Sequence, residues 1–166
     1  LSSYLSNRTQ CVTIGNESSA HSPLLTGVPQ GSVLGPLLFC LYTSPLSHLF
    51  HNSAISYHLY ADDTQLYFAF SGSDSSAALA NLSLMLDTVH AWFTANRLFL
   101  NPDKTEFLLI GTSQQRAKIL ASTLTFAGNN IKPSLHARNL GVEVDSNLFL
   151  DHHISNVCRS SFFLIR

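Results

Sequence analysis

The spacing of apolar positions changes from two to nearly four near the middle of the chain. Over residues 55–70, apolar residues alternate with polar ones on both sides of Asp62 and Asp63. This alternation predicts a β-hairpin with acidic residues at its tip. Beyond it, Asp74 or Ser75 suits the N-cap of a helix, and apolar residues recur every three or four positions, which predicts a long amphipathic helix. The residues of this stripe are Leu79, Leu82, Leu86, Val89 and Phe93.

Upstream of the hairpin, residues 27–36 are crowded with glycine and proline, which predicts a loop. Pro36 suits the first turn of a helix because its missing N–H would have no partner there. Leucines follow at helical spacing, so a buried helix is expected after the loop. Nearer the start, weak alternation over residues 10–15 predicts a strand, and the polar residues 16–19 predict a turn.

The second half of the chain predicts shorter elements. Two apolar runs within residues 98–110 flank Asn-Pro-Asp-Lys at residues 101–104, where proline presets a tight reversal, so a second hairpin is expected. A strand followed by a turn is expected at residues 124–130, a short strand at residues 140–144, and a helix from Leu150 onward. These elements predict one domain of mixed α and β elements, an α+β fold.

Composition limits how the chain could bind a partner. With 166 residues and 45% hydrophobic side chains, it can build a sizeable core. Nine Lys and Arg against ten Asp and Glu give a formal net charge of −1. A protein that grips a nucleic-acid duplex normally neutralises phosphates with basic side chains. If the partner is a nucleic acid, we expect most of the basic contact surface to lie in other parts of the protein.

Cysteine and histidine predict neither a disulfide framework nor a zinc site. The three cysteines are odd in number and far apart, so we expect a reduced, intracellular setting without disulfide partners. His48 and His51, and likewise His152 and His153, are close in sequence. Because no acidic or thiol residue lies near His48 and His51 in sequence, we expect no zinc ion.

The apolar run over residues 33–42 is far shorter than the ~20 residues that a membrane span needs, so no membrane partner is expected. No targeting signal is recognisable in the chain, which leaves nucleus and cytoplasm both open. The chain begins at Leu1 rather than at a methionine and stops within an apolar pattern. We therefore expect both ends to be cut from a longer protein.

Asp62 and Asp63 are the residues with the clearest chemistry. Two adjacent carboxylates at a hairpin tip offer the hard oxygen ligands that Mg²⁺ takes together with substrate phosphates. In a two-metal site, one ion activates the attacking hydroxyl and the other stabilises the leaving group. Because neighbouring side chains on a strand diverge, Asp62 is expected to bind the metal directly and Asp63 to support it. For an isolated Asp-Asp pair, ordinary turn chemistry is the better explanation.

Three blocks in a fixed order decide between these interpretations. They are residues 27–36 (GVPQGSVLGP), residues 60–63 (YADD) and residues 100–105 (LNPDKT). Each block alone has a plainer explanation, as a capped helix, a turn or a solvated lysine. In this order they resemble the palm motifs of reverse transcriptases, above all those of LINE-type retrotransposons without long terminal repeats. The likeness extends over most of the chain, from about Gly27 to Val144.

This resemblance implies an RNA-directed DNA polymerase that uses two Mg²⁺ ions to join deoxynucleotides to a DNA primer on an RNA template. It implies that Asp62 and Asp63 are the metal-binding carboxylates. Lys104 would lie near the triphosphate as the third catalytic residue and give a proton to the leaving pyrophosphate, a task that suits a lysine. The residues implied to border the primer end, incoming nucleotide and template base are Gly27, Pro29, Gln30, Gly31, Ser32, Tyr60 and Ala61. The segment Leu140-Gly141-Val142 resembles the primer-supporting element.

The same resemblance implies that part of the active site is missing. The family takes a third carboxylate from a strand upstream of the first block, but the sole acidic residue before Gly27 is Glu17, in a turn-like setting. We therefore expect residues 1–145 to be a partial palm, in which an antiparallel sheet contains the acidic hairpin and helices pack on one face. Residues 146–166 are expected to be the truncated start of a following helical region. By itself the chain is expected to be inactive. Two alternatives are a non-catalytic remnant of a decayed element, which binds nucleic acid or protein at most, and a generic Mg²⁺ phosphotransferase.

Overall fold

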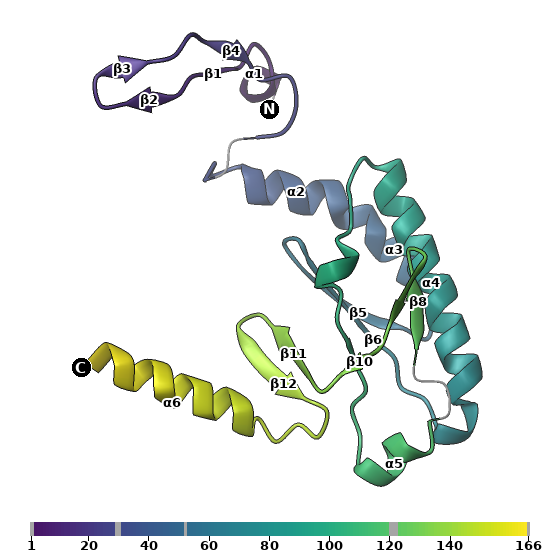
Figure 1. Cartoon of the computed structure of the whole chain (residues 1–166). Coiled ribbons are helices and arrows are strands. Elements are labelled where there is room, and N and C mark those ends of the chain that lie inside the picture. The colour runs from purple at the N-terminus through teal and green to yellow at the C-terminus, as the bar shows by residue number, and fades with distance from the viewer. Residues whose placement is uncertain (1, 29–30, 52, 120–122, 166) are drawn as a thin grey trace. The chain divides into compact units, whose positions relative to one another are not determined.

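A computed structural model describes residues 2–28, 31–51, 53–119 and 123–165 (Figure 1). The chain divides into two compact units, Leu1–Ser44 and Pro45–Arg166. Both units combine short strands with helices, so the predicted mixture of α and β elements is confirmed. The predicted boundary between residues 145 and 146 stays a prediction.

In the first unit, short strands pair as two antiparallel ladders, β1 with β4 and β2 with β3. The strand predicted at residues 10–15 is broken in two, because its two parts pair with different partners: Gln10 pairs with β4, whereas Thr13 and Ile14 pair with β3. The Val12 carbonyl accepts the Ser19 N–H at 2.9 Å, next to the β2–β3 pairs. The predicted turn is shorter than expected and is formed by Gly15 and Asn16. The elements of this unit are α1 (Ser2–Leu5), β1 (Thr9–Gln10), β2 (Thr13–Ile14), β3 (Glu17–Ser18), β4 (Ser22–Pro23) and α2 (Gly35–Thr43).

Helix α2 begins as predicted, with Pro36 in its first turn. The prediction that this helix is buried is wrong, since Leu37 and Leu41 are 58% and 59% exposed and Thr43 is its buried residue. Apolar residues follow one another over residues 37–42, so the helix is apolar on every side and would need neighbours on every side to be buried. The other described elements of the first unit are the four-residue α1 and two-residue strands, which are too small to cover it.

The second unit begins with helical turns and then forms the predicted hairpin and long helix. Helix α4 begins after Asp74, one of the two predicted N-caps, and buries Leu79, Leu86, Val89 and Phe93 of the predicted stripe. The elements of this unit are η1 (Ser44–Leu46, which begins at the boundary), α3 (Ser47–Phe50), β5 (Ser56–Tyr60), β6 (Asp63–Tyr67), η2 (Gly72–Asp74), α4 (Ser75–Ala95), η3 (Pro102–Lys104), β7 (Phe107–Leu108), α5 (Ser113–Ala117), β8 (Leu124–Phe126), β9 (Asn129–Ile131), β10 (Pro133–Ser134), β11 (His136–Asn139), β12 (Val142–Asp145) and α6 (Asp151–Ile165).

The described strands pair two at a time instead of forming the single antiparallel sheet that was expected. Most pairs are antiparallel, but β7 and β10 are parallel. The strands are two to five residues long. Tight turns with positive φ close the β8–β9 and β11–β12 hairpins, at Ala127-Gly128 and Leu140-Gly141. Such turns match the right-handed twist of the strands that they join.

The second hairpin predicted at residues 98–110 is wrong. Residues 98–100 form no strand, and Pro102 instead begins the short helical turn η3. The Asn101 side chain caps this turn by accepting the Asp103 N–H at 3.0 Å. The side chains of Leu98 and Leu100 pack against the core, but their backbone is not paired with a neighbouring strand. Strand β7 consequently finds its partner in the distant β10.

Helix α4 carries the core of the second unit. One buried cluster lies between α4, the helical turns before the hairpin, and the start of the hairpin, and consists of Leu46, Phe50, Ile55, Val89 and Phe93. The other lies between α4, β7 and β8, and consists of Leu79, Leu86, Phe107, Leu124 and Phe126. Leu66, Leu82 and Leu100 pack against both clusters, so the core is continuous. Each large apolar side chain that is fully buried contributes about 1.5–3 kcal/mol.

Helix α6 is more exposed than α4. It has no buried residue, and Phe162, Phe163, Leu164 and Ile165 are each at least 75% exposed. Within the described part of the chain, no helix combines the length and the apolar character that crossing a bilayer requires. Cys11, Cys40 and Cys158 are free and exposed thiols.

The α4 core can be tested with a matched pair of substitutions. Leu79 is 4% exposed, so Leu79→Ala should lower the free energy of unfolding by about 2–5 kcal/mol, because it leaves a cavity. Leu84 lies on the same helix and is 66% exposed, so Leu84→Ala should change it by less than about 0.5 kcal/mol. Urea unfolding followed by the fluorescence of Trp92, the single tryptophan, measures both. Equal losses in the two variants would contradict the packing described.

Candidate active site

The predicted hairpin with acidic residues at its tip is present. Strands β5 and β6 pair from Ser56 with Tyr67 to Tyr60 with Asp63, and Ala61 and Asp62 form the two-residue turn. Ala61 has a φ of +52°, which is unusual for a residue with a side chain. Such strained positions persist when the surrounding structure fixes them. Here five paired residues in each strand hold the turn that carries Asp62.

The two faces of the hairpin differ in what they contact. On one face, Leu59 and Leu66 pack against the core, and the Tyr57 ring stacks on Phe50 with 4.7 Å between ring centroids. Because side chains alternate along a strand, the partners Tyr60 and Asp63 lie on the opposite face. Tyr60 is 60% exposed. The core therefore fixes the hairpin from one side and leaves the acidic side open to solvent.

Both carboxylates are exposed, so a hydrated cation can reach them without a large desolvation cost. The donor set, two carboxylates with no nitrogen or sulfur, suits Mg²⁺. Within the described residues, no third His, Cys, Asp or Glu side chain lies close enough to share an ion with Asp62 and Asp63. The hairpin thus offers two exposed carboxylates at its tip.

Lys104 is the last residue of η3 and is exposed. Its backbone is fixed by the turn, since its N–H donates to the Asn101 carbonyl at 3.2 Å. As far as the structure describes the chain, its amine makes no ion pair with Asp62 or Asp63. The structure thus leaves this amine free to turn towards an anionic ligand.

The predicted nucleotide-binding loop belongs to the first unit. Gly27 and Gly31 have φ values of +70° and +85°, a region in which a side chain would be strained. The Arg8 guanidinium donates to the Gly27 carbonyl at 2.6 Å, and the hydroxyls of Tyr4 and Ser32 are hydrogen-bonded. Pro29 and Gln30, the other two predicted residues of this loop, lie outside the described residues.

The structure adds two residues that the sequence reasoning missed. Gln65 and Asn139 exchange hydrogen bonds through their side-chain amides, one of them 3.2 Å long, which joins β6 to β11. Gln65 lies two residues beyond Asp63 and therefore on the same face of the hairpin. The alternation of side chains along β6 could have indicated that Gln65 shares a face with Asp63. No sequence pattern could have indicated Asn139, because its contact depends on which strand lies beside β11.

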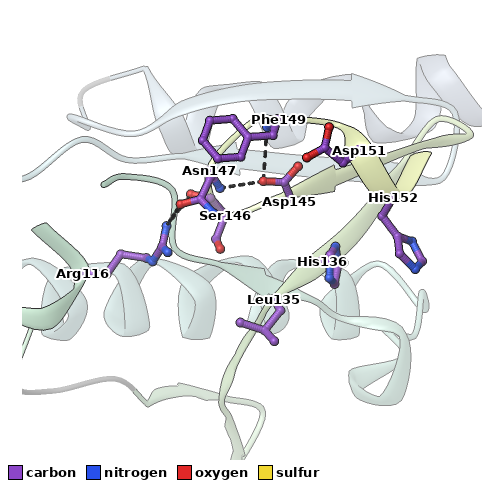
Figure 2. Close-up of a pocket in the computed structure, with 9 residues that line it drawn as sticks. All are labelled: Arg116, Leu135, His136, Asp145, Ser146, Asn147, Phe149, Asp151 and His152. Atoms are coloured by element: carbon purple, nitrogen blue, oxygen red, sulfur yellow. Dashed lines mark hydrogen bonds between the residues drawn. The ribbon is translucent and has the colours of Figure 1, made fainter. Parts of the chain in front are cut away.

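A pocket of about 310 Å³ lies elsewhere in the second unit, between α5, the β11–β12 hairpin and the start of α6 (Figure 2). The Asp145 carboxylate accepts the backbone N–H groups of Asn147, Phe149 and Leu150 at 2.8, 3.3 and 2.7 Å. Arg116 donates to the Ser146 carbonyl at 2.8 Å. None of the predicted site residues lines this pocket, and two of its polar side chains, Asp145 and Arg116, hold the connection from β12 to α6.

The environment of Asp145 acts on its pKa in two directions. Partial burial raises the pKa, but the three backbone N–H groups that bind the carboxylate outweigh burial and hold the pKa below its ordinary value. A carboxyl with a lowered folded pKa stabilises the fold above its unfolded pKa. That stabilisation is lost as pH falls through the folded value.

Asp145→Asn should therefore lower stability near neutral pH and make stability less dependent on pH below about 4, the ordinary aspartate pKa. Urea unfolding over a series of acidic pH values measures this dependence. Asp87→Asn is the matched control, because Asp87 is exposed in the middle of α4. Parallel pH profiles for the wild type and Asp145→Asn would contradict the role given to Asp145.

Comparison with known proteins gives consistent matches. A family model described as reverse transcriptase (RNA-dependent DNA polymerase) matches residues 1–144. The chain is 32% identical over 170 residues to the probable RNA-directed DNA polymerase from transposon BS of Drosophila melanogaster, a match that covers 98% of this chain and 18% of that protein. It is 26% identical over 161 residues to the RNA-directed DNA polymerase from mobile element jockey of the same species, covering 93% of this chain and 17% of that protein.

A shorter match is 51% identical over 43 residues to the probable RNA-directed DNA polymerase from transposon X-element of Drosophila melanogaster, and it covers 26% of this chain and 5% of that protein. The chain thus spans less than a fifth of the length of the curated relatives that it matches. No solved structure matches it.

Proposed function

The chain belongs to the reverse transcriptase (RNA-dependent DNA polymerase) family, and from this membership we propose that it is a partial palm of an RNA-directed DNA polymerase encoded by a retrotransposon. The reaction would join deoxynucleotides to the 3′ end of a DNA primer on an RNA template. Template and deoxynucleoside triphosphates are both found inside cells, so the proposed reaction is intracellular. A generic Mg²⁺ phosphotransferase would not account for the family match over residues 1–144.

One observation carries the proposal. The hairpin packs against the core and exposes Asp62 and Asp63 at its tip, and these two residues belong to the second of the three sequence blocks. Asp62 would bind Mg²⁺ directly and Asp63 would support it, each offering carboxylate oxygens. The bound ions would activate the primer 3′-oxygen and stabilise the charge on the leaving pyrophosphate. Tyr60, exposed beside Asp63, would lie against the primer terminus.

The remaining roles follow from the chemistry of the other two blocks. The backbone of the Gly27–Ser32 loop, including Gln30, would border the incoming nucleotide and the template base, because glycine allows a close approach of the backbone. Lys104 would lie by the triphosphate and give the proton on Nζ to the leaving pyrophosphate. The amide pair of Gln65 and Asn139 would hold the primer-supporting Leu140-Gly141-Val142 turn against the catalytic hairpin.

The proposal assigns the rest of the active site to other parts of the polymerase. Two carboxylates are fewer than the three that the family uses, and a net charge of −1 offers little for binding phosphates. The curated relatives are more than five times longer than the segment that they share with this chain. We therefore propose that this polypeptide does not polymerise by itself. The small number of carboxylates and the net charge of −1 also favour a second candidate, a non-catalytic remnant that binds nucleic acid or protein.

A primer-extension assay tests the proposed inactivity. With an RNA template, a DNA primer and Mg²⁺ or Mn²⁺, the chain alone should add no nucleotides, because its metal site lacks a ligand. An active reverse transcriptase in the same reaction serves as the positive control. Incorporation that disappears in Asp62→Asn would contradict the prediction and show that the chain suffices for catalysis.

Metal binding separates the incomplete site from the non-catalytic remnant. Mn²⁺ takes the same oxygen ligands as Mg²⁺ and can be followed by its effect on water proton relaxation. We expect Asp62→Ala to bind Mn²⁺ severalfold more weakly than the wild type, since it removes a charged ligand. Asp87→Ala, the same substitution at an exposed site on α4, should bind it unchanged. Identical binding by the wild type and Asp62→Ala would favour the remnant.

A further inference from the structure

Three side chains from three different elements converge in the second unit, away from the acidic hairpin tip. They are His136 at the start of β11, Glu143 in β12 and His152 in the first turn of α6. One ligand atom from each side chain lies within 4.8 Å of the corresponding atoms of the other two. Two imidazoles and a carboxylate are a ligand set that proteins use for zinc.

Strand register explains how the first two meet. His136 is paired with Asp145, and Glu143 lies two residues from Asp145 on the same strand. Because alternate residues share a face, His136 and Glu143 are diagonal neighbours on one face of the β11–β12 hairpin. Helix α6 brings in the third residue: the rings of His136 and His152 are 4.9 Å apart, and His152 Nδ1 lies 2.7 Å from Glu143 Oε1.

The cluster is held by a second layer of contacts. Asn156, one turn after His152, donates to Glu143 Oε2 at 2.9 Å and so orients the carboxylate. The bonds of Asp145 and Arg116 fix the connection from β12 to α6, and with it the position of His152.

We propose that His136, Glu143 and His152 bind one late first-row transition-metal ion, with Zn²⁺ as the best fit, and that the ion clamps the first turn of α6 to the β11–β12 hairpin. Three protein ligands leave a fourth tetrahedral position for water or an outside ligand. Mg²⁺ would not compete, since it prefers an all-oxygen shell. The site is therefore chemically distinct from that of Asp62 and Asp63, and the inference does not depend on the proposed function.

The observed separations are compatible with such a site. Zinc–ligand bonds of about 2.0–2.2 Å in a tetrahedron place ligand atoms roughly 3.3 Å apart. The pair of His152 and Glu143 is already closer than this, and the remaining approach to His136 is on the order of 1 Å. The side chain of His152 is 56% exposed and His136 is also exposed, so both can turn without unpacking the core. The ion would replace the direct contact between His152 and Glu143.

The competing explanation is a plain contact between His152 and Glu143 that needs no metal. A zinc titration of the chain, carried out without a polyhistidine tag and in competition with a chromophoric chelator, separates the two. We expect one equivalent of Zn²⁺ to bind the wild type. His136→Asn, Glu143→Gln and His152→Asn should each weaken binding by roughly tenfold or more. A loss that large is expected because even the removal of a residue that supports a ligand costs about 10–100-fold.

Two further variants keep the result interpretable. His48→Asn, at an exposed histidine outside the cluster, should bind zinc as the wild type does. Asn156→Ala leaves all three ligands in place and should weaken binding about 10–100-fold through loss of the bond to Glu143. Circular dichroism confirms that each variant is folded. Co²⁺ in place of Zn²⁺ should give the absorption of a four-coordinate ion, and millimolar Mg²⁺ should not displace it.

The clamp also predicts an effect on stability. A ligand that binds the folded state alone raises the unfolding temperature, so Zn²⁺ should raise that of the wild type by several degrees and that of Glu143→Gln by clearly less at the same zinc concentration. Absence of stoichiometric zinc binding, or equal binding by the wild type and all three ligand variants, would overturn the proposal and leave the plain contact between His152 and Glu143.

Discussion

The burial of one stripe of α4 is the constraint on which the second unit depends. Its apolar residues pack against the acidic hairpin in one buried cluster and against β7 and β8 in the other. Partly buried leucines contact both clusters and join them. Because Leu59 and Leu66 occupy the inner face of the hairpin, Tyr60 and Asp63 must face outward. Packing that involves none of the predicted site residues thus determines the face on which Asp63 lies.

Polar contacts extend this arrangement from the hairpin to α6. The amides of Gln65 and Asn139 join β6 to β11, and Asp145 and Arg116 join β12 to the start of α6. Strand β11 carries both Asn139 and His136, at opposite ends. An ion bound at His136 would therefore stiffen the same β11–β12 hairpin that contacts β6 of the acidic hairpin. The two proposed metal sites differ in ligand chemistry, with oxygen ligands at one and imidazoles with a carboxylate at the other.

Local elements were largely predictable where one physical signal dominated. The alternation around Asp62 predicted the hairpin, and the spacing of Leu79 to Phe93 predicted α4, because each pattern matches one period of backbone geometry. Prediction failed where signals were mixed. The apolar run of α2 predicted a buried helix, but the helix is largely exposed. Pro102 is compatible with a helical turn as well as with a hairpin, and it begins a helical turn. Short strands could pair with several partners, so their final pairing did not follow from their own sequence.

By itself, the sequence determined the family: three ordered blocks resembled reverse transcriptases of LINE-type retrotransposons, and the family match over residues 1–144 confirms that resemblance. It also determined which carboxylates lie at the hairpin tip, since a turn and its flanking strands are encoded within a few neighbouring residues. The tertiary structure alone decided that Gln65 meets Asn139 and that His136, Glu143 and His152 converge. These contacts depend on strand register and on the direction in which α6 leaves β12, and no spacing along the chain records either.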